Sequence, residues 1–232
     1  QNPQPQFDDL KLRYDEEYFS YELGNERQFF SLMMQGLDDI AFFDRANGLH
    51  RHGPFLDVGC ATGILLEGMK ERRWDVQGVE ICEPAARYGR EHRGVPIHVG
   101  TLEEASLPSN HFSAVHFSHV IEHVPDPRAF LGEVYRVLAP SGLCVIVTPD
   151  VSGFQARLFG SRWRSAIADH LHLFSHKSLA RLLNELGFTV EEKRSWGGLA
   201  VGAAPKALKR VADPLAKRLN VGDVMILLCR KE

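Results

Sequence analysis

The stretch from Pro54 to Met69 reads Pro-Phe-Leu-Asp-Val-Gly-Cys-Ala-Thr-Gly-Ile-Leu-Leu-Glu-Gly-Met, and it predicts a short strand, a tight turn and the start of a helix. The apolar run from Phe55 to Val58 is typical of a buried strand. Gly59 and Gly63 let the backbone turn sharply and come close to a ligand. Such a turn leaves backbone N–H groups unpaired at the strand's carboxyl end, where a ligand with polar or anionic groups can bind.

The spacing of the glycines indicates which cofactor class this turn suits. A dinucleotide-binding turn has the pattern Gly-x-Gly-x-x-Gly. Here the pattern is Asp-x-Gly-x-x-x-Gly, and Ala61 follows Cys60 where a second glycine would help a pyrophosphate approach. The glycines alone also fit the βα turn of any α/β protein. The whole motif resembles motif I of the class I S-adenosylmethionine (AdoMet) methyltransferases.

Composition and charge narrow the class of protein. The 232 residues suffice for one α/β domain with added segments or for two small domains, and 44% hydrophobic residues predict a packed core. A net charge of −3 gives no electrostatic footprint for nucleic acid, so we expect no nucleic-acid partner. No apolar run approaches the roughly 20 residues of a membrane span, and no signal peptide is evident. The four isolated cysteines lack a Cys-x-x-Cys pair, which favours buried thiols and a cytoplasmic location.

The pattern after the glycine turn predicts alternating strands and helices, as a doubly wound sheet requires. The expected strands after Phe55–Val58 are Asp75–Ile81, Val95–Val99, Ser113–Ser118 and Leu143–Thr148, and the expected helices are Ile64–Arg73, Ala85–His92 and Phe130–Leu138. A turn is expected at Pro140-Ser-Gly. The apolar runs Phe188–Ser195 and Val224–Arg230 predict a final antiparallel pair, which the resemblance also implies.

Glu80 ends the second predicted strand, about 20 residues past the glycine turn. An acidic residue there can accept hydrogen bonds from both hydroxyls of a ribose, although an exposed strand-end charge is the plain alternative. Ile81 beside it is expected to pack on a base. The resemblance implies an acidic residue near Thr101 that binds the adenine amino group. Because this sequence has a threonine there, we expect Thr101, Leu102 and backbone groups to make those contacts.

The same resemblance assigns the remaining cofactor contacts to three parts of the chain. They come from the glycine turn with the strand before it, from the end of the fourth predicted strand and from the N-terminal region: Asp57, Gly59, Cys60, Ala61, Gly63, Ser118, Tyr18 and Tyr21. The N-terminal region is predicted to be helical from about Asp15 to Asn47, as two helices or as one with a break near Gly36. A tyrosine hydroxyl there is expected to bind the methionine carboxylate, while core packing is the alternative for these aromatic rings.

The stretch Ser118-His-Val-Ile-Glu-His-Val-Pro-Asp-Pro resembles the segment after the fourth strand in small-molecule methyltransferases of the type 11 and ubiquinone-biosynthesis groups. If it forms a helical turn, His119, Glu122 and His123 lie on one face. His123, or else His119, is then a candidate general base. The alternatives are a metal site of these three residues and a purely structural role. The metal-binding version in related methyltransferases has Glu where His119 stands, which leaves a metal undecided.

The region from Pro149 to Ser175 loses regular periodicity and is rich in aromatic, basic and histidine residues. Since it follows a strand's carboxyl end, we expect a cap over the active-site crevice, with Trp163, His170 and His172 as substrate contacts. His170 and His172 would point to one side if this run is extended. Ser175 is the expected N-cap of a helix from His176 to Leu186.

Residues 205–219 contain a basic amphipathic pattern that Pro214 interrupts. Such a helix can contact a membrane surface or an anionic substrate, and a solvated surface helix is the alternative.

Together these observations predict an α/β fold: a doubly wound, seven-stranded Rossmann-like methyltransferase sheet with its last strand antiparallel, an N-terminal helical lid and a cap after the fifth strand. We expect one domain made of a lid (1–50), an AdoMet-binding core (51–148), the cap (149–176) and a C-terminal helix and strand pair with the basic insertion (177–232).

The resemblance, which covers roughly Phe55 to Phe188, implies an AdoMet-dependent methyltransferase that releases S-adenosyl-L-homocysteine. We expect a small-molecule acceptor and O-methylation of a hydroxyl, with N- or C-methylation as the alternative, because no motif marks DNA, RNA or protein methylation. A dinucleotide-dependent oxidoreductase and a non-catalytic AdoMet-binding or partner-regulating protein are the competing hypotheses. Neither the acceptor nor the oligomeric state follows from the sequence.

Overall fold

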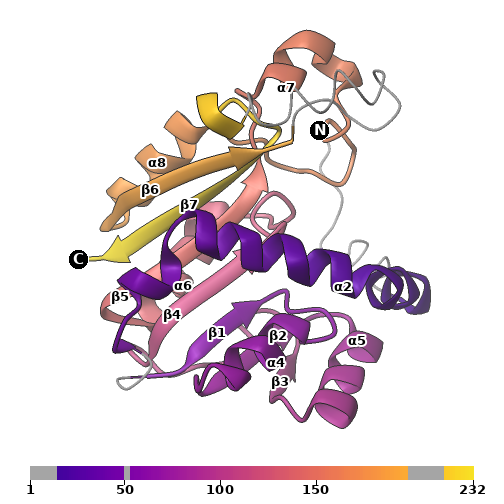
Figure 1. Ribbon diagram of the computed structural model, residues 1–232, viewed down its shortest axis with the longest axis vertical. Helices are drawn as coiled ribbons and strands as arrows, with labels where there is room; N and C mark the ends of the chain where they lie inside the picture. The colour runs from indigo at the N-terminus through magenta and orange to yellow at the C-terminus, as the bar shows by residue number, and fades with distance from the viewer. Residues whose placement is uncertain (1–14, 50–52, 198–216) are drawn as a thin grey trace.

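The computed structural model describes residues 15–49, 53–197 and 217–232, and a seven-stranded sheet forms its centre (Figure 1). The strands lie in the order β3-β2-β1-β4-β5-β7-β6. Their bounds are β1 Phe55–Val58, β2 Val76–Glu80, β3 Ile97–Val99, β4 Phe112–Ser118, β5 Leu138–Pro149, β6 Phe188–Trp196 and β7 Val224–Lys231. Strand β7 runs antiparallel to both of its neighbours, and β1 to β5 pair in parallel. The predicted sheet is therefore confirmed.

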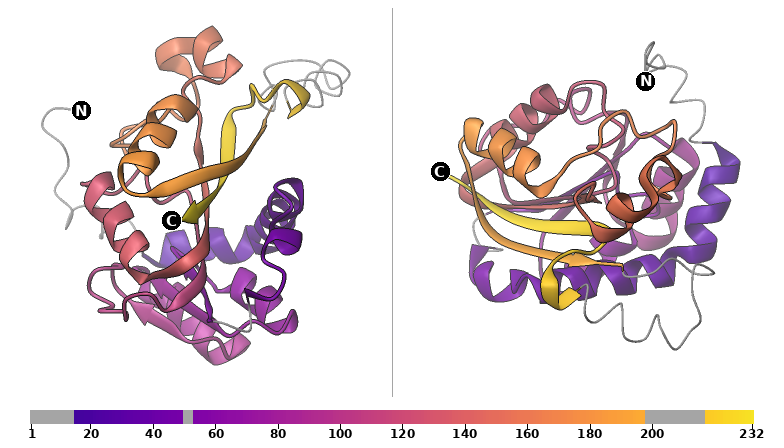
Figure 2. Two further views of the ribbon diagram at one scale, coloured as in Figure 1. Left: turned by 90° about the vertical axis from the view of Figure 1, so that its left-hand side faces the viewer. Right: turned by 90° about the horizontal axis from the view of Figure 1, so that it is seen from above.

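Helices cover both faces of the sheet (Figure 2). Their bounds are α2 Glu16–Asp39, α3 Phe42–Arg45, α4 Ile64–Glu71, α5 Glu83–Tyr88, α6 Pro127–Val137, α7 Phe154–Phe159 and α8 His176–Glu185. Apolar residues of α6 and α8 pack on one face, and those of α2, α3 and α4 pack on the other. Successive residues of β5 and β7 contribute to opposite core clusters, as the two-residue period of a strand requires.

Local capping explains where several of these helices begin and end. Asp126 accepts hydrogen bonds from the first backbone N–H groups of α6, and Pro127 opens that helix. Ser175 caps α8 through a reciprocal capping box with Ser178, so the predicted N-cap is confirmed. Gly187 follows α8 with a φ of 91°, a conformation that favours glycine.

The N-terminal region forms two helices, which is one of the two predicted arrangements, but the break comes at Ala41, whose φ is 53°, and α2 is continuous through Gly36. Two other predicted boundaries were wrong. The Pro140-Ser-Gly turn instead lies within β5 as an irregularity, where the pairing with β4 jumps from Leu138 to Leu143 and Ser141 has a φ of 61°. Helix α5 ends at Tyr88, and a π-helical segment from Gly89 to Arg93 replaces its predicted last turn.

All four cysteines are buried and unpaired, as predicted. None of the helices within the described residues has the length and apolar character needed to cross a bilayer.

Gly78 in β2 makes room for the turn that follows β1. A β-carbon at position 78 would lie 2.5 Å from the Cys60 sulfur and 2.8 Å from a Leu66 methyl carbon. These contacts are far inside van der Waals distance. The glycine is therefore needed for the turn to pack against the sheet.

We expect Gly78→Ala to lower the free energy of unfolding by about 1–3 kcal/mol, because the added methyl group overpacks this site. Gly132→Ala is the matched control, since a β-carbon there meets nothing within 4 Å and alanine favours a helix. Urea unfolding of both variants measures the difference. Equal stability of Gly78→Ala and the parent protein would contradict the assigned role of Gly78.

Candidate active site

A cavity of about 1220 Å³ opens at the carboxyl ends of β1, β2, β4 and β5. Helix α2, residues 100–104, the segment after β4, part of residues 164–170, and residues of β6 and β7 complete its wall. This is where strand order reverses between β1 and β4, the usual ligand position in a doubly wound sheet. Its volume exceeds the roughly 300–1,000 Å³ of a typical small-molecule pocket, so two small molecules fit together.

The glycine turn after β1 lies at the cavity with an unusual backbone conformation. Gly59, Ala61 and Gly63 have φ values of 71°, 46° and 74°. A β-carbon at Gly59 would lie 2.6 Å from a methyl carbon of Val120, so only glycine fits there without displacement. Gly59, Cys60 and Ala61 line the cavity, whereas Gly63 begins α4 behind it.

The Glu80 carboxylate connects this turn to the end of β2. One oxygen accepts the Ala61 N–H at 2.8 Å, and the other accepts the Cys82 N–H at 2.8 Å. Glu80 is only 3% exposed, and its side chain lines the cavity. Burial raises the pKa of Glu80 to about 7, although its two backbone donors act in the opposite direction. Near neutral pH this carboxyl group is thus divided between its protonated and ionised forms.

Asp57 forms a buried pair that the sequence did not reveal. Its carboxylate lies 2.7 Å from Nδ1 of His116, and both residues line the cavity. The two residues are directly paired across β1 and β4. His116 lies within β4, among mostly apolar residues. The register in which β1 and β4 pair places it beside Asp57.

A second wall of the cavity contains Ile81, Thr101 and Leu102, together with Glu103 and Glu104. The Thr101 N–H donates to the Glu104 carboxylate at 2.7 Å, while the Thr101 hydroxyl accepts the Glu104 N–H at 3.2 Å. The resemblance implied an acidic residue near Thr101. Glu104 lies three residues further along the chain, and it was not predicted from the sequence.

Helix α2 faces the cavity with Tyr18, Glu22 and Glu26, which are spaced four residues apart. Tyr21 does not line the cavity: it is 60% exposed and its ring lies against Phe29. Tyr21 therefore lies away from the cavity that Tyr18 lines, because it projects from another side of the helix. The two glutamates were missed, although their helical spacing from Tyr18 was readable in the sequence.

Arg93 attaches α2 to the glycine turn and to α4. Its guanidinium lies 2.5 Å from carboxylate oxygens of both Glu26 and Glu67. Its Nε donates to the Thr62 carbonyl at 2.9 Å, and the Thr62 hydroxyl donates to Glu26 at 3.2 Å. The Arg93 side chain is only 10% exposed, so solvent screens these charges weakly.

After β4 the chain forms a hydrogen-bonded turn rather than a helix, in which the His123 N–H donates to the Val120 carbonyl at 2.9 Å. Glu122 points into the core, with one oxygen 2.9 Å from Nδ1 of His119 and the other accepting the Thr148 hydroxyl at 2.9 Å. Burial acts to raise the pKa of Glu122, but the hydrogen bond and charge of His119 outweigh it and lower that pKa.

His119 lines the cavity and has a left-handed backbone, with a φ of 55°. Its side chain is 48% exposed, whereas that of its partner Glu122 is 1% exposed. A buried carboxylate therefore orients an accessible imidazole at the cavity wall. This geometry is typical of a histidine that exchanges protons with a bound molecule.

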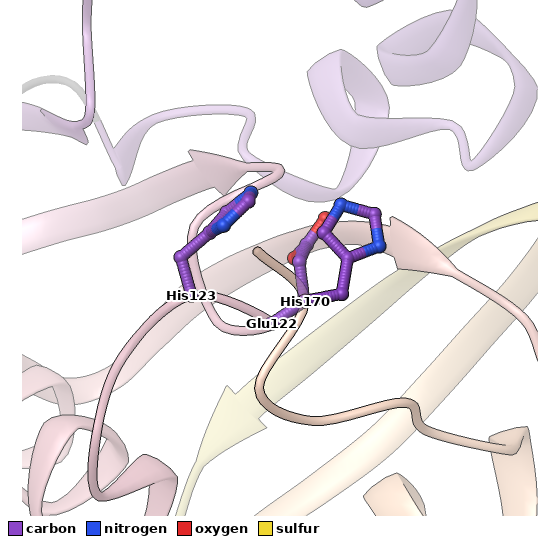
Figure 3. Close-up of side chains that lie close together, drawn as sticks. All are labelled: Glu122, His123 and His170. Carbon is purple, nitrogen blue, oxygen red and sulfur yellow. The ribbon is translucent and has the colours of Figure 1, made fainter. Parts of the chain in front are cut away.

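Figure 3 shows a second arrangement around Glu122, formed with His123 and His170. Possible ligand atoms of these three side chains lie within 4.8 Å of one another. Nδ1 of His123 lies 3.0 Å from the Asp169 carbonyl, and Nδ1 of His170 lies 2.8 Å from the Ser165 carbonyl. The group that could hold a metal thus contains His170 in place of the predicted His119.

Of the three predicted substrate contacts, only His170 lines the cavity. Trp163 is 3% exposed and donates its indole N–H to Asp223, and Nε2 of His172 lies 3.3 Å from the Pro125 carbonyl. The run that contains His170 and His172 is not an extended strand, so the condition under which they would share one side is not met. Arg164 lines the cavity but was missed, and its Nε donates to Asp223 at 2.5 Å.

Most of the predicted basic helix at 205–219 lies outside the described residues. Within its described end, Lys217 forms an ion pair with Asp39 at 2.6 Å.

Comparison with known proteins gives a family match. A family model described as "Methyltransferase domain" matches residues 26–193. A ubiquinone biosynthesis O-methyltransferase of Psychrobacter cryohalolentis is 34% identical over 101 residues, covering 40% of this chain and 39% of that protein. The protein of the same name from Cereibacter sphaeroides is 32% identical over 115 residues, covering 47% of each chain. The chain thus spans less than half the length of these relatives.

Two solved structures share the fold. A SAM-dependent methyltransferase from Archaeoglobus fulgidus is 21% identical, with a TM-score of 0.64 and coverage of 91% of this chain and 99% of the other. A SAM-dependent methyltransferase from Thermotoga maritima, described as a possible histamine N-methyltransferase, is 22% identical, with a TM-score of 0.59 and coverage of 83% and 96%.

The raised pKa of Glu80 predicts how stability depends on pH. Since that pKa rises from its ordinary value of 4.5 to about 7 in the fold, the folded protein binds the Glu80 proton more tightly than the unfolded chain does. This tighter proton binding stabilises the folded protein. The contribution of Glu80 to the free energy of unfolding is present below pH 4.5 and is lost as the pH rises to about 7. The loss is on the order of 3 kcal/mol.

Urea unfolding of the ligand-free protein across this pH range tests the prediction. The variant Glu80→Gln removes the titrating group, and its stability should fall less steeply with pH than that of the parent protein. Parallel pH profiles for the two proteins would refute the assignment of this proton to Glu80.

Proposed function

This chain belongs to the methyltransferase-domain family, and from that premise we propose that it transfers the methyl group of AdoMet to a hydroxyl of a small molecule. AdoMet is the methyl donor of this family. The observation that carries the choice of a hydroxyl acceptor is the accessible His119 imidazole, held at the cavity by the buried Glu122 carboxylate.

The cavity residues fit AdoMet. Gly59, Cys60 and Ala61 line the cavity, and the left-handed backbone of Gly59 is held by a residue without a β-carbon, so a ligand can approach the turn closely. The Glu80 carboxylate can accept hydroxyl hydrogen bonds beside its two backbone donors. Glu22 adds a carboxylate to the wall, which suits a ligand with positively charged groups, whereas the carboxylate of Glu26 is already paired with Arg93. When bound, AdoMet supplies a methyl group on a sulfonium, which is already a strong electrophile.

We assign the contacts by chemical type. Glu80 binds the ribose, and Ile81, Thr101 and Leu102 surround the adenine. The methionine portion is surrounded by Asp57, Ser118, Tyr18 and the backbone of Gly59, Cys60 and Ala61. Gly63 ends the turn that forms this part of the wall. The protein's main task is then alignment and exclusion of water, for which α2 forms a lid and residues 149–176 form a cap.

His119 is the proposed general base. Since the Glu122 carboxylate accepts from Nδ1, the imidazole keeps its second nitrogen, Nε2, to accept a proton from the acceptor hydroxyl. The negative charge of Glu122 stabilises the imidazolium that results, and the Thr148 hydroxyl holds Glu122 in place. His123 was the preferred base from sequence, but its Nδ1 faces the backbone carbonyl of Asp169, whereas Nδ1 of His119 faces a carboxylate.

The acceptor side of the cavity has an apolar wall. Phe29, Leu32, Met33, Trp196 and Ile226 all line it. Such a wall suits an aromatic or otherwise apolar molecule bearing a hydroxyl. The curated relatives, named as ubiquinone biosynthesis O-methyltransferases, support the same reaction type. N- or C-methylation is the alternative, and it would not require a base at His119.

Replacing His119 tests the proposal. A screen with radiolabelled AdoMet against hydroxylated aromatic compounds first identifies an acceptor. We then expect His119→Ala to lower kcat by about 100-fold or more, because the general base is lost. AdoMet affinity, measured by calorimetry, should stay nearly unchanged.

His172→Ala is the matched control, since His172 lies outside the cavity wall. Normal turnover of His119→Ala would exclude it as the base. Failure of the parent protein to bind AdoMet would overturn the proposed function itself.

The group of Glu122, His123 and His170 supports a second candidate, in which this site binds a divalent cation. Two imidazoles and a carboxylate suit zinc and other first-row transition metals. Under this alternative the purified protein should take up Zn²⁺ or Mn²⁺ in calorimetry, and His170→Ala should abolish that uptake. If neither metal binds the parent protein, this alternative fails and the His119 proposal is unaffected.

A further inference from the structure

Exposed apolar side chains gather in the segment that follows β5. Of the nine large hydrophobic residues exposed within the described part of the chain, five lie between positions 151 and 173. Leu158 is 64% exposed and Ile167 is 49% exposed, and Phe159 next to Leu158 is 37% exposed. We call the exposed surface of residues 151–168 the cap face. Single exposed apolar residues are ordinary, but a group in one short segment marks an interaction surface.

The charge of the cap face is entirely positive. Between Asp150 and Asp169 the sequence contains Arg157, Arg162 and Arg164 and no acidic residue, although the whole chain has a net charge of −3. Arg164 pairs with the buried Asp223. Arg157 and Arg162 are exposed, and no ion pair joins either to an acidic side chain within the described residues. They flank the pair Leu158-Phe159, so positive charge and apolar surface occur together.

A second exposed segment lies directly beside the cap face. The Phe154 N–H donates to the Val221 carbonyl at 3.0 Å, which joins the start of α7 to the chain just after Leu219. Leu219 is 59% exposed, and Arg218 precedes it. Figures 1 and 2 show α7 at the end of the molecule toward which the carboxyl end of β5 points, clear of the rest of the sheet. Among the described residues, the cap face therefore lies at the outer edge of the molecule, where a flat surface can reach it.

We propose that the cap face docks on an anionic lipid bilayer. Exposed leucine and phenylalanine can enter the boundary between headgroups and acyl chains, while the flanking arginines remain among the negative headgroups. The absence of acidic residues over this segment favours an anionic membrane over a protein partner, whose surface normally mixes both charges. This docking goes beyond methyl transfer. Because Arg164, Ser165 and His170 also line the cavity, it would bring the cavity close to the membrane.

Flotation with lipid vesicles tests this proposal on the whole chain. Vesicles of phosphatidylcholine with about one third phosphatidylglycerol should bind the protein, whereas vesicles of phosphatidylcholine alone should bind it weakly, and high salt should weaken binding. Arg157→Gln with Arg162→Gln should reduce binding at least about tenfold, because each arginine near such a surface contributes about fivefold. Leu158→Ser with Phe159→Ser should also reduce it.

Arg87→Gln with Arg181→Gln is the matched control, since both arginines are exposed on other helices, and it should bind like the parent protein. AdoMet binding should be unchanged in every variant, which separates this test from that of the methyltransferase function. Equal binding by all variants, equal binding to neutral vesicles, or no vesicle binding together with capture of a protein partner would each overturn the proposal.

Discussion

The buried carboxylate of Glu80 is the contact on which the geometry of the cavity depends. Its two oxygens accept the N–H groups of Ala61 and Cys82, so one side chain joins the turn after β1 to the end of β2. Burial makes the ionised form costly, and the pKa of Glu80 rises accordingly. We infer that a ligand offering hydroxyl donors relieves this cost. The glycine turn, Gly78 and Cys60 then form a closely packed base beneath that ligand.

Two further sets of contacts hold other parts of the cavity wall in place. Arg93 holds α2 against the glycine turn through Glu26, while Thr148 and Glu122 hold His119 at the end of β4. Glu26 and His119 both line the cavity, which opens where the strand order reverses between β1 and β4. The residues proposed to bind the methyl donor and the proposed proton acceptor therefore face one cavity. This separation of tasks explains how one fold can serve many acceptors, since the acceptor side uses different elements.

Local signals in the sequence predicted most of the fold and the donor side of the site. The apolar run at Phe55–Val58, the glycine turn and the acidic end of the next strand depend on neighbours in the chain, and each was found as expected. His116 and Arg164 could not be predicted, because strand register and the buried Asp223 bring them to the cavity. Of the two tyrosines predicted to contact the ligand, Tyr18 lines the cavity, and Tyr21, less than one helical turn away, does not. Because both residues are tyrosines, residue type alone could not show which of them faces the cavity.

Calorimetry of the ligand-free protein with AdoMet, S-adenosyl-L-homocysteine and NAD tests whether this cavity binds AdoMet. We expect AdoMet and S-adenosyl-L-homocysteine to bind and NAD not to bind, and we expect Glu80→Ala to weaken the binding of the first two by about 1–3 kcal/mol through loss of charged hydrogen bonds. Tight binding of NAD without binding of AdoMet, or unchanged AdoMet affinity in Glu80→Ala, would contradict these expectations.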